Sequence, residues 1–207
     1  MLGDGALAFR EFAMQEPVPL AEIHRAVLEF LQRVDDAVLF GAQAVNAYVD
    51  EPRMTQDVDV VSLRAAELAE QIRALLAERF RIAVRVREAG HGRGFRVYQL
   101  QKPKNRHLVD VRAVVALPPA KRVEGLLVVT PEELIAGKLM ASHRRQGTPK
   151  YFTDRRDLAV MLLAYPQLKA GHGPVRDRLI AAGADDAVLA AWEDVVAQTI
   201  RPEEDDF

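Results

Sequence analysis

The sequence predicts an α+β (α/β) fold: a small mixed β-sheet flanked by helices, followed by a C-terminal helical bundle. Short segments rich in valine alternate with amphipathic helical segments in the first part of the 207-residue chain. Beyond a proline- and glycine-bounded stretch near residue 120, helical patterns alone remain. We therefore predict an α/β domain over 1–117, a helical domain packed on it over 126–200, and an acidic tail over 201–207.

The first domain opens with a helix over 20–34, where apolar residues recur at helical spacing. A short buried strand over 37–40 ends at Gly41, from which a helix over 42–48 is expected to begin. The remaining elements are a strand over 56–61, an amphipathic helix over 64–80, and strands over 82–86, 95–100 and 108–114.

The second domain follows a predicted linker that contains Pro118, Pro119 and Gly125. Thr130 and Pro131 resemble an N-cap residue and the first residue of a helix that runs to about Arg145. Further helices are expected over 153–164, 175–182 and 185–198.

Composition limits the classes of function. The chain has no cysteine, which excludes disulfides, thiolate zinc sites and cysteine nucleophiles. No apolar run reaches the roughly 18–20 residues that a membrane span needs, and the first residues lack the pattern of a signal peptide, so we expect a cytoplasmic protein without a membrane partner. From Arg79 to Arg112 the chain carries ten basic and two acidic residues, a pattern typical of a solvated sheet face or of a surface that attracts polyphosphate or nucleic acid.

The main chemical signal is a pair of aspartates in a predicted strand. Side chains at positions i and i+2 of a strand face the same side, so Asp57 and Asp59 project together while Val58 and Val60 face the core. Mg²⁺ is usually held by one or two carboxylates together with substrate phosphates. The pair therefore predicts a metal site shared with a nucleotide.

Two other segments complete this predicted site. Asp110 is a lone acid in an apolar strand, where a carboxylate is costly unless it is paired with an arginine or bound to metal. Gly41 joins a strand to a helix, a geometry that either forms a plain tight turn or presents backbone N–H groups to an anion through Gly41, Ala42 and Gln43.

The helical half offers a lysine and two acids. Lys138 lies within the helix predicted from residue 131 and could reach a phosphate as a point charge. Asp154 and Asp157 are one turn apart at the predicted start of the next helix, where negative charge is favourable in any case. The five histidines are scattered without i, i+4 pairs, so no zinc site is predicted.

The order of these motifs resembles the nucleotidyltransferase fold superfamily of polymerase-beta type. The matching residues are Gly41-Ala42, then Arg53-x-Thr55-x-Asp57-Val58-Asp59, then Asp110. The segments Leu134-Ile-Ala-Gly-Lys138-Leu and Asp154-Arg-Arg-Asp157-Leu are similar to the AbiEii/AbiGii toxin branch. The resemblance covers roughly residues 39–163.

The resemblance implies Mg²⁺- or Mn²⁺-dependent transfer of a nucleotide from an NTP. It assigns Asp57, Asp59 and Asp110 to the metal, and Gly41, Ala42, Gln43, Arg53, Thr55 and Lys138 to the nucleotide. Lys138 and Asp154 are implied as further catalytic positions. The superfamily usually has Gly-Ser where this chain has Gly41-Ala42, and the branch commonly has Lys-Asp where it has Thr153-Asp154, so Asp157 competes with Asp154.

The acceptor stays open at this point. The toxin branch implies a tRNA or other RNA 3′ end or a protein hydroxyl as acceptor, together with a cognate antitoxin protein as partner. One alternative is an enzyme that modifies a small molecule such as an antibiotic. The others are a catalytically silent binding protein with the same fold and a nucleic-acid-binding protein without chemistry.

Overall fold

The computed structural model describes residues 18–90 and 92–202. The expectations for the first 17 residues, for His91 and for residues 203–207 of the acidic tail lie outside the described residues. The helices are α2 (Leu20–Leu31), α3 (Gly41–Asn46), α4 (Ala65–Phe80), α5 (Pro131–Arg144), α6 (Pro149–Ala164), α7 (Pro174–Ala181) and α8 (Asp186–Ala197), with a short 3₁₀ turn over Pro166–Leu168. The strands are β1 (Ala37–Phe40), β2 (Val58–Ser62), β3 (Val84–Ala89), β4 (Gly94–Gln99), β5 (Arg106–Ala113), β6 (Ala120–Val123) and β7 (Leu126–Val129).

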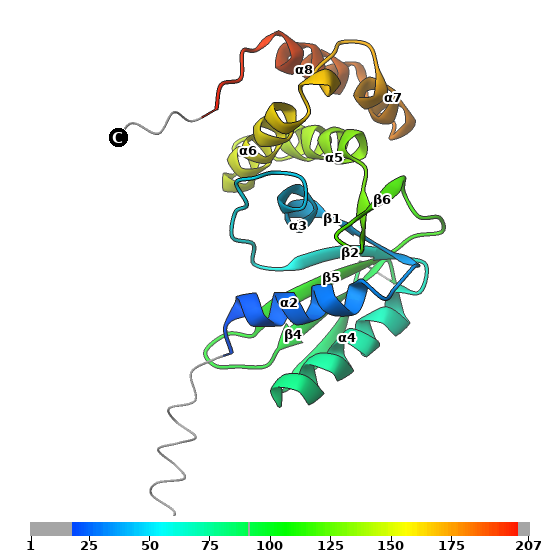
Figure 1. Cartoon of the computed structure of the whole chain (residues 1–207), viewed down its shortest axis with the longest axis vertical. Helices are drawn as coiled ribbons and strands as arrows, with labels where there is room; N and C mark the ends of the chain where they lie inside the picture. The colour runs from blue at the N-terminus through cyan, green and yellow to red at the C-terminus, as the bar shows by residue number, and fades with distance from the viewer. Residues whose placement is uncertain (1–17, 91, 203–207) are drawn as a thin grey trace, which may run out of the picture.

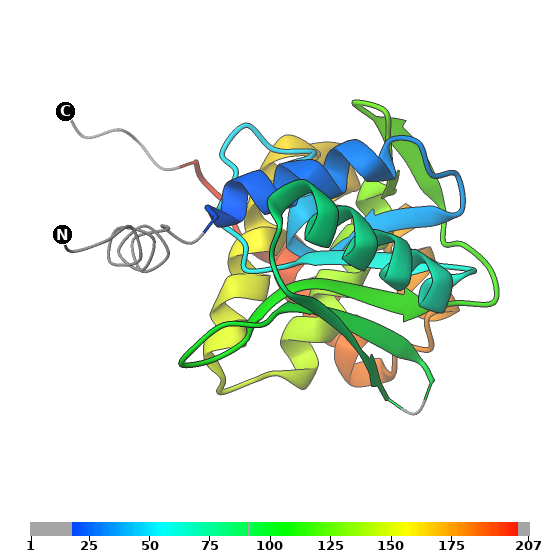
Figure 2. The same ribbon diagram turned by 90° about the horizontal axis from the view of Figure 1, so that it is seen from below.

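The strands form one mixed sheet in the order β3-β4-β5-β2-β1-β7-β6. Strand β2 lies at its centre, parallel to β5 and antiparallel to β1. Helices α2 and α4 lie next to each other across one face of the sheet (Figures 1 and 2). Helices α5 to α8 gather on the opposite side (Figure 1). The predicted mixed sheet flanked by helices is confirmed.

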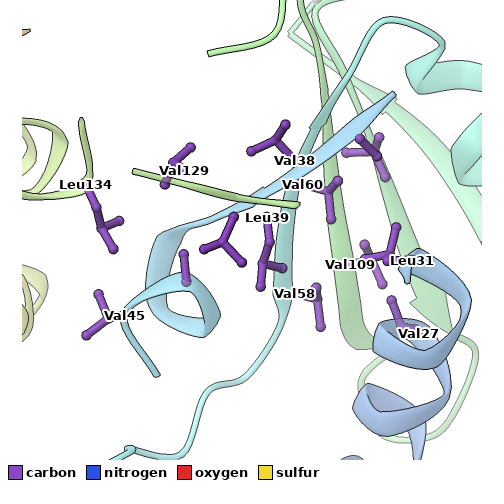
Figure 3. Close-up of a cluster of buried hydrophobic side chains, with 14 of the residues drawn as sticks. Val27, Leu31, Val38, Leu39, Val45, Val58, Val60, Val109, Val129 and Leu134 are labelled. Carbon is purple, nitrogen blue, oxygen red and sulfur yellow. The ribbon is translucent and has the colours of Figure 1, made fainter. Parts of the chain in front are cut away.

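The core follows from the alternation of side chains along the strands. Val58 and Val60 of β2 are fully buried, and Val109 of the neighbouring β5 faces the same layer. Figure 3 shows these valines close to Val27 and Leu31 of α2. This apolar packing fixes β2 and β5 side by side, so the alternate residues of both strands share the other face.

The apolar core of the sheet continues into the helical half as one cluster. Trp192 of α8 is fully buried, as expected for a packing residue, and its indole N–H donates to the backbone oxygen of Ala170. Helix α8 begins at an Asp185 cap, whose side chain accepts from the N–H of Val188. In the part of the chain that the structure describes, none of the helices has the length and apolar character of a membrane span.

The predicted linker over 118–125 is wrong in its secondary structure. Ala120–Val123 forms β6, which pairs with β7 (Leu126–Val129), and β7 continues the sheet through a parallel pairing of Val128 with Leu39. Glu124 and Gly125, the two residues between β6 and β7, both have positive φ angles, 50° and 84°, as a tight two-residue hairpin turn requires. The segment that begins at residue 126, predicted to be helical, therefore starts with a strand, and the division into two domains stays a prediction.

The start of the second C-terminal helix also differs from its prediction. Helix α6 begins at Pro149, four residues before the predicted start at 153, with proline in the first turn. Asp154 and Asp157 consequently lie inside the helix, where the favourable effect of a helix N-terminus has faded. Another interaction must compensate their burial.

Candidate active site

One row of residues runs straight across the sheet on the face opposite α2 and α4. Arg87 of β3 is paired with Arg96 of β4, and Arg96 is paired with Asp110 of β5. Asp110 is in turn paired with Asp59 of β2, which faces Phe40 at the end of β1. Residues directly opposite each other in neighbouring strands point to the same face. The predicted acids Asp59 and Asp110, 51 positions apart in sequence, are therefore direct neighbours.

Asp57 joins this group from the residue before β2. It is partly exposed, as Asp59 is, while Val58 between them is buried. The predicted common orientation of the two aspartates therefore agrees with the alternation of burial. All three carboxylates meet on one side of the two central parallel strands.

Gly41 lies against Asp59. Its φ of 72° is in the left-handed region, and a Cβ placed on it would lie 2.9 Å from both Cβ and Cγ of Asp59, and closer still to Oδ2. Glycine is thus required here twice, for its backbone angle and for its lack of a side chain. The predicted binding of phosphate by this turn stays a prediction, and the structure places the turn beside the Asp59 carboxylate.

The electrostatic surroundings of Asp59 disfavour its charge. Burial, and next the neighbouring charge of Asp57, raise the pKa of Asp59 to about 6. The positive charges of Arg112 and Lys138 act in the opposite direction but are outweighed. An acid in this state is stabilised by any added cation that it can reach.

His107 lies between the two other aspartates. Its Nδ1 is 3.0 Å from Asp57 Oδ2 and its Nε2 is 3.3 Å from Asp110 Oδ1. Burial lowers the pKa of His107, but the contacts with Asp110 and Asp57 outweigh burial and raise it to about 10. Asp110 also accepts from Arg96 Nε at 3.0 Å, so the strand arginine considered in the sequence analysis is present at one of its oxygens.

The pKa of Asp110 is affected by the same contacts. Burial raises it, and the contacts with His107 and Arg96 lower it below its ordinary value. The pKa of Asp110 is thus shifted downward, in the opposite direction from that of Asp59.

The predicted nucleotide-binding residues of the first half are also brought together. The side-chain amide of Gln43 donates to the Thr55 hydroxyl at 2.7 Å, which connects α3 to the loop before β2. Gln43 Nε2 also lies 3.4 Å from Nδ1 of the buried His24. Ala42 follows Gly41 in the first turn of α3. Arg53, which lies in the loop before β2 with Thr55, extends its side chain to Asp157 of α6.

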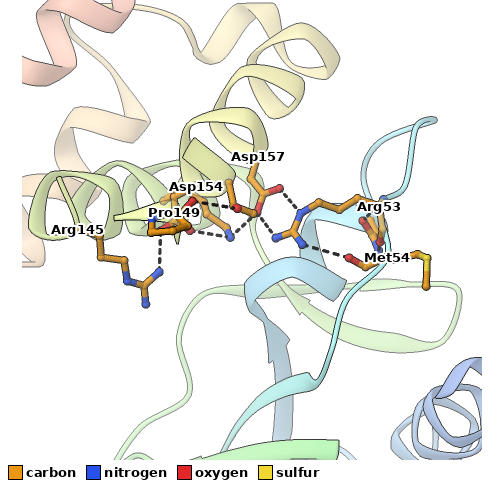
Figure 4. Close-up of polar contacts among 9 residues, drawn as sticks. Arg53, Met54, Arg145, Pro149, Asp154 and Asp157 are labelled. Carbon is orange, nitrogen blue, oxygen red and sulfur yellow. Dashed lines mark hydrogen bonds and ion pairs between the residues drawn. The ribbon is translucent and has the colours of Figure 1, made fainter. Parts of the chain in front are cut away.

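The predicted lysine is the centre of a buried network of charges. Lys138 Nζ lies 2.6 Å from Asp157 Oδ2 and 3.3 Å from Asp154 Oδ1. Asp157 also accepts two hydrogen bonds from Arg53, at 2.7 and 2.8 Å, and Asp154 accepts one from Arg145 at 2.6 Å (Figure 4). Asp157 is fully buried, and although burial raises its pKa, Arg53 and Lys138 together hold it below the ordinary value.

This network compensates the cost of burying Asp154 and Asp157, which lie inside α6, away from its N-terminus. It also connects the loop before β2 to the helical half. Arg53 of that loop donates to Asp157 of α6, although the two residues are 104 positions apart in sequence. Both Asp154 and Asp157 contact Lys138, and Asp157 makes the larger number of hydrogen bonds.

The donor atoms at the sheet are suited to a divalent cation. Asp57, His107 and Asp110 each offer one ligand atom, and these atoms lie within 4.8 Å of one another. Two ligands at about 2.1 Å from one ion are at most about 4.2 Å apart, so small side-chain rotations would close the group on an ion. Asp59 stands beside this group, against Gly41.

A family comparison identifies the chain. The family described as "Nucleotidyl transferase AbiEii toxin, Type IV TA system" matches residues 25–191. The chain belongs to this family. As a member of the AbiEii family it is a nucleotidyltransferase.

Solved structures with the same fold agree with the AbiEii assignment at the level of architecture. The chain is similar to the Megavirus polyadenylate synthase, with 12% identity and a TM-score of 0.59 over 78% of this chain and 35% of that one, so it spans about a third of the viral enzyme. It is similar to JHP933 from Helicobacter pylori, with 16% identity and a TM-score of 0.56 over 95% and 92% of the two chains. It also resembles the antibiotic-resistance factor ANT(2″)-Ia, with 14% identity and a TM-score of 0.50 over 84% and 95%. No curated protein matches by sequence.

One member of the site in this AbiEii protein was missed by sequence reasoning. His107 and Asp110 are three residues apart, and on a regular strand they would face opposite sides. The pairing of Val97 with Val109 and of Tyr98 with His107 leaves Leu108 without a partner on β4, which is a β-bulge. The signal in the sequence was the pair Leu108-Val109, two consecutive apolar residues. Both are buried, whereas on a regular strand only one of two consecutive side chains faces the core.

Proposed function

We propose that this AbiEii-family protein transfers a nucleoside monophosphate from an NTP to a hydroxyl of an RNA, with a divalent cation at Asp57, Asp59 and Asp110. The observation that carries the proposal is the meeting of three carboxylates, distant in sequence, beside the turn at Gly41. Mg²⁺ or Mn²⁺ held there supplies charge neutralisation of the triphosphate.

The chemistry is an in-line displacement. The acceptor hydroxyl oxygen forms a bond to the α-phosphorus, the bond from that phosphorus to the β-phosphate oxygen breaks, and pyrophosphate leaves with the electron pair. Asp110, held as a carboxylate by its neighbours, accepts the hydroxyl proton. We assign the backbone of Gly41 and Ala42 to the phosphates, with Gln43 and Thr55 supporting that turn through their hydrogen bond.

Lys138 is assigned to the charge that develops on the departing pyrophosphate. Support comes from geometry: Asp157 joins Lys138 to Arg53, which belongs to the loop that leads to Asp57 and β2. Asp154 and Arg53 take positioning roles, because Asp154 contacts the Lys138 ammonium and Arg53 holds Asp157 on the other side of it.

An RNA acceptor is supported by the charge beside the acids. Arg87 and Arg96 continue the row of Asp59 and Asp110 across β4 and β3, and both side chains are exposed. Arg85 is paired with Tyr98 in the next row of the same face, and the Arg87 guanidinium lies 5.9 Å from the Tyr98 ring centroid. Exposed arginines next to an aromatic ring suit the phosphates and bases of a single strand.

The decisive experiment offers each α-labelled NTP with Mg²⁺ to the native protein in the presence of total RNA. We expect label on RNA with native protein and none with Asp57→Asn. A parallel reaction with aminoglycosides replaces the RNA, and label on the small molecule alone would replace our acceptor by an antibiotic. Absence of label on RNA, with protein shown to be folded, would reject the proposed transfer to an RNA hydroxyl.

The role of the exposed arginines has its own control. The double variant Arg85→Ala/Arg87→Ala is expected to raise KM for RNA while kcat changes little, because these residues lie away from the three acids. Arg73→Ala on α4, which packs on the other face, removes the same charge and should leave KM unchanged.

A further inference from the structure

His107 occupies the position between Asp57 and Asp110 that the family assignment alone does not explain. One ring nitrogen faces each carboxylate, at 3.0 and 3.3 Å. A histidine that served only as packing would not need both nitrogens to face acids. The ring therefore belongs to the same cluster of ligand atoms as the two aspartates.

The position of the ring is fixed by the backbone and by a neighbour. The bulge at Leu108 turns His107 to the face that carries Asp110. The ring of Tyr98, paired with it across the strands, lies 5.1 Å from the imidazole centroid at a tilt of 34°. Both features orient the imidazole before any ligand arrives, which is what a metal ligand requires.

Its Nε2 is also a buried atom that is poorly satisfied. Among the described residues this nitrogen has no hydrogen bond of acceptable geometry, although Asp110 Oδ1 is 3.3 Å away. Buried polar atoms are normally paired, and an exception needs an explanation. A cation shared by the imidazole and the carboxylate would satisfy both.

We propose that His107 is a ligand of the catalytic cation, so that the site binds through one nitrogen as well as carboxylate oxygens and prefers Mn²⁺ to Mg²⁺. The inference rests on the proposed function and adds the identity of the cation to it. Mg²⁺ requires oxygen ligands and keeps several waters, whereas imidazole is a common ligand of first-row transition metals.

A competing explanation predicts the opposite effect of His107 on the affinity of the site for cations. If the imidazole only fills the space between two carboxylates as a positive charge, it competes with every cation. Its removal would then tighten the binding of Mn²⁺ and Mg²⁺ alike. The two explanations therefore differ in the sign of the change.

The test is cation binding to the full chain without nucleotide or RNA. Mn²⁺ binding is followed by electron paramagnetic resonance and Mg²⁺ by its displacement of Mn²⁺. The variant His107→Phe removes both nitrogens and keeps a ring against Tyr98, and His172→Phe, at an exposed histidine of the helical half, is the matched control. We expect His107→Phe to weaken Mn²⁺ binding by about tenfold or more with a smaller change for Mg²⁺, so that the preference falls.

A spectroscopic measurement supports or overturns the assignment independently. Pulsed electron paramagnetic resonance of bound Mn²⁺ should show coupling to an imidazole nitrogen in the native protein and in His172→Phe, and none in His107→Phe. Unchanged or tighter binding in His107→Phe, or absence of nitrogen coupling in the native protein, overturns the proposal. Asp57→Asn distinguishes failure of the His107 assignment from failure of the proposed function. If this variant too binds Mn²⁺ as the native protein does, the proposed function fails as well.

Discussion

The carboxylates at the sheet and the carboxylates on α6 lie in contrasting surroundings. On α6, Asp154 and Asp157 share three positive partners, Lys138, Arg53 and Arg145, and burial is compensated by short hydrogen bonds. At the sheet, Asp59 is disfavoured as an anion, and the pKa of its carboxyl rises to about 6.

The difference shows which of the two clusters has its negative charges compensated by the protein's own side chains. A buried network with every charge paired holds the structure together, and removing one member leaves others uncompensated. At the sheet, the negative charge of Asp59 is disfavoured, and a carboxylate in that state is suited to an added cation. We therefore expect substitutions at the sheet to act mainly on activity and those on α6 to act mainly on stability.

The largest expected effect is on catalysis, from Asp110→Asn. The variant removes one negative charge from the proposed metal site, so kcat for nucleotidyl transfer should fall by on the order of 10²–10³-fold or more. Stability should change by no more than about 1 kcal/mol, because Arg96 is half exposed and His107 keeps Asp57 as a partner. Steady-state kinetics and urea unfolding measure the two quantities. A loss of stability as large as the loss of activity would remove the contrast between the clusters.

The largest expected effect on stability comes from Asp157→Ala. Arg53 and Lys138 would lose their shared partner inside the protein, which should lower the free energy of unfolding by about 3–5 kcal/mol. Asp50→Ala, at an exposed aspartate, is the control and should change it by less than about 0.5 kcal/mol. If the variant does not fold well enough for denaturant titration, Asp154→Ala should give a smaller loss in the same direction.

Gly41→Ala tests the close approach to Asp59. The positive φ alone costs about 1–2 kcal/mol for alanine, and the added Cβ must also displace the Asp59 carboxylate. Gly147 has a similar φ of 77°, and among the described residues no atom lies within 4 Å of a Cβ placed there. Gly147→Ala should therefore lose stability only, and Gly41→Ala should lose activity too. Full activity in Gly41→Ala would mean that the position of Asp59 is unimportant.

Asp59→Asn has the most unusual expected effect, a gain in stability. The folded protein raises the pKa of Asp59 from 3.8 to about 6, so this group favours folding less as pH rises through that window. In the presence of a chelator, the variant should be more stable than the native protein by about 3 kcal/mol at pH 7 and little different at pH 4. Chemical unfolding at the two pH values tests this. Equal differences at both would show that Asp59 does not carry the unfavourable charge.

The sheet side of this contrast was predicted from the sequence, whereas the network around the α6 acids was not, and the missing parts have physical causes. Alternation along a strand predicted the common face of Asp57 and Asp59, because burial of Val58 forces it. The bulge that adds His107 and the hairpin turn at Glu124 depend on pairing between strands, which a single segment does not reveal. Similarly, the role of Asp157 became visible only when Arg53, 104 residues away, was placed beside it.

The central claim is that the sheet acids bind a cation and the α6 acids do not. It is tested most directly by titrating Mn²⁺ into three proteins: native, Asp110→Asn, and Asp154→Asn. Our account predicts that the native protein and Asp154→Asn bind Mn²⁺ with similar affinity, while Asp110→Asn binds at least about tenfold more weakly. Native-like binding by Asp110→Asn, or its loss in a folded Asp154→Asn, would contradict the account.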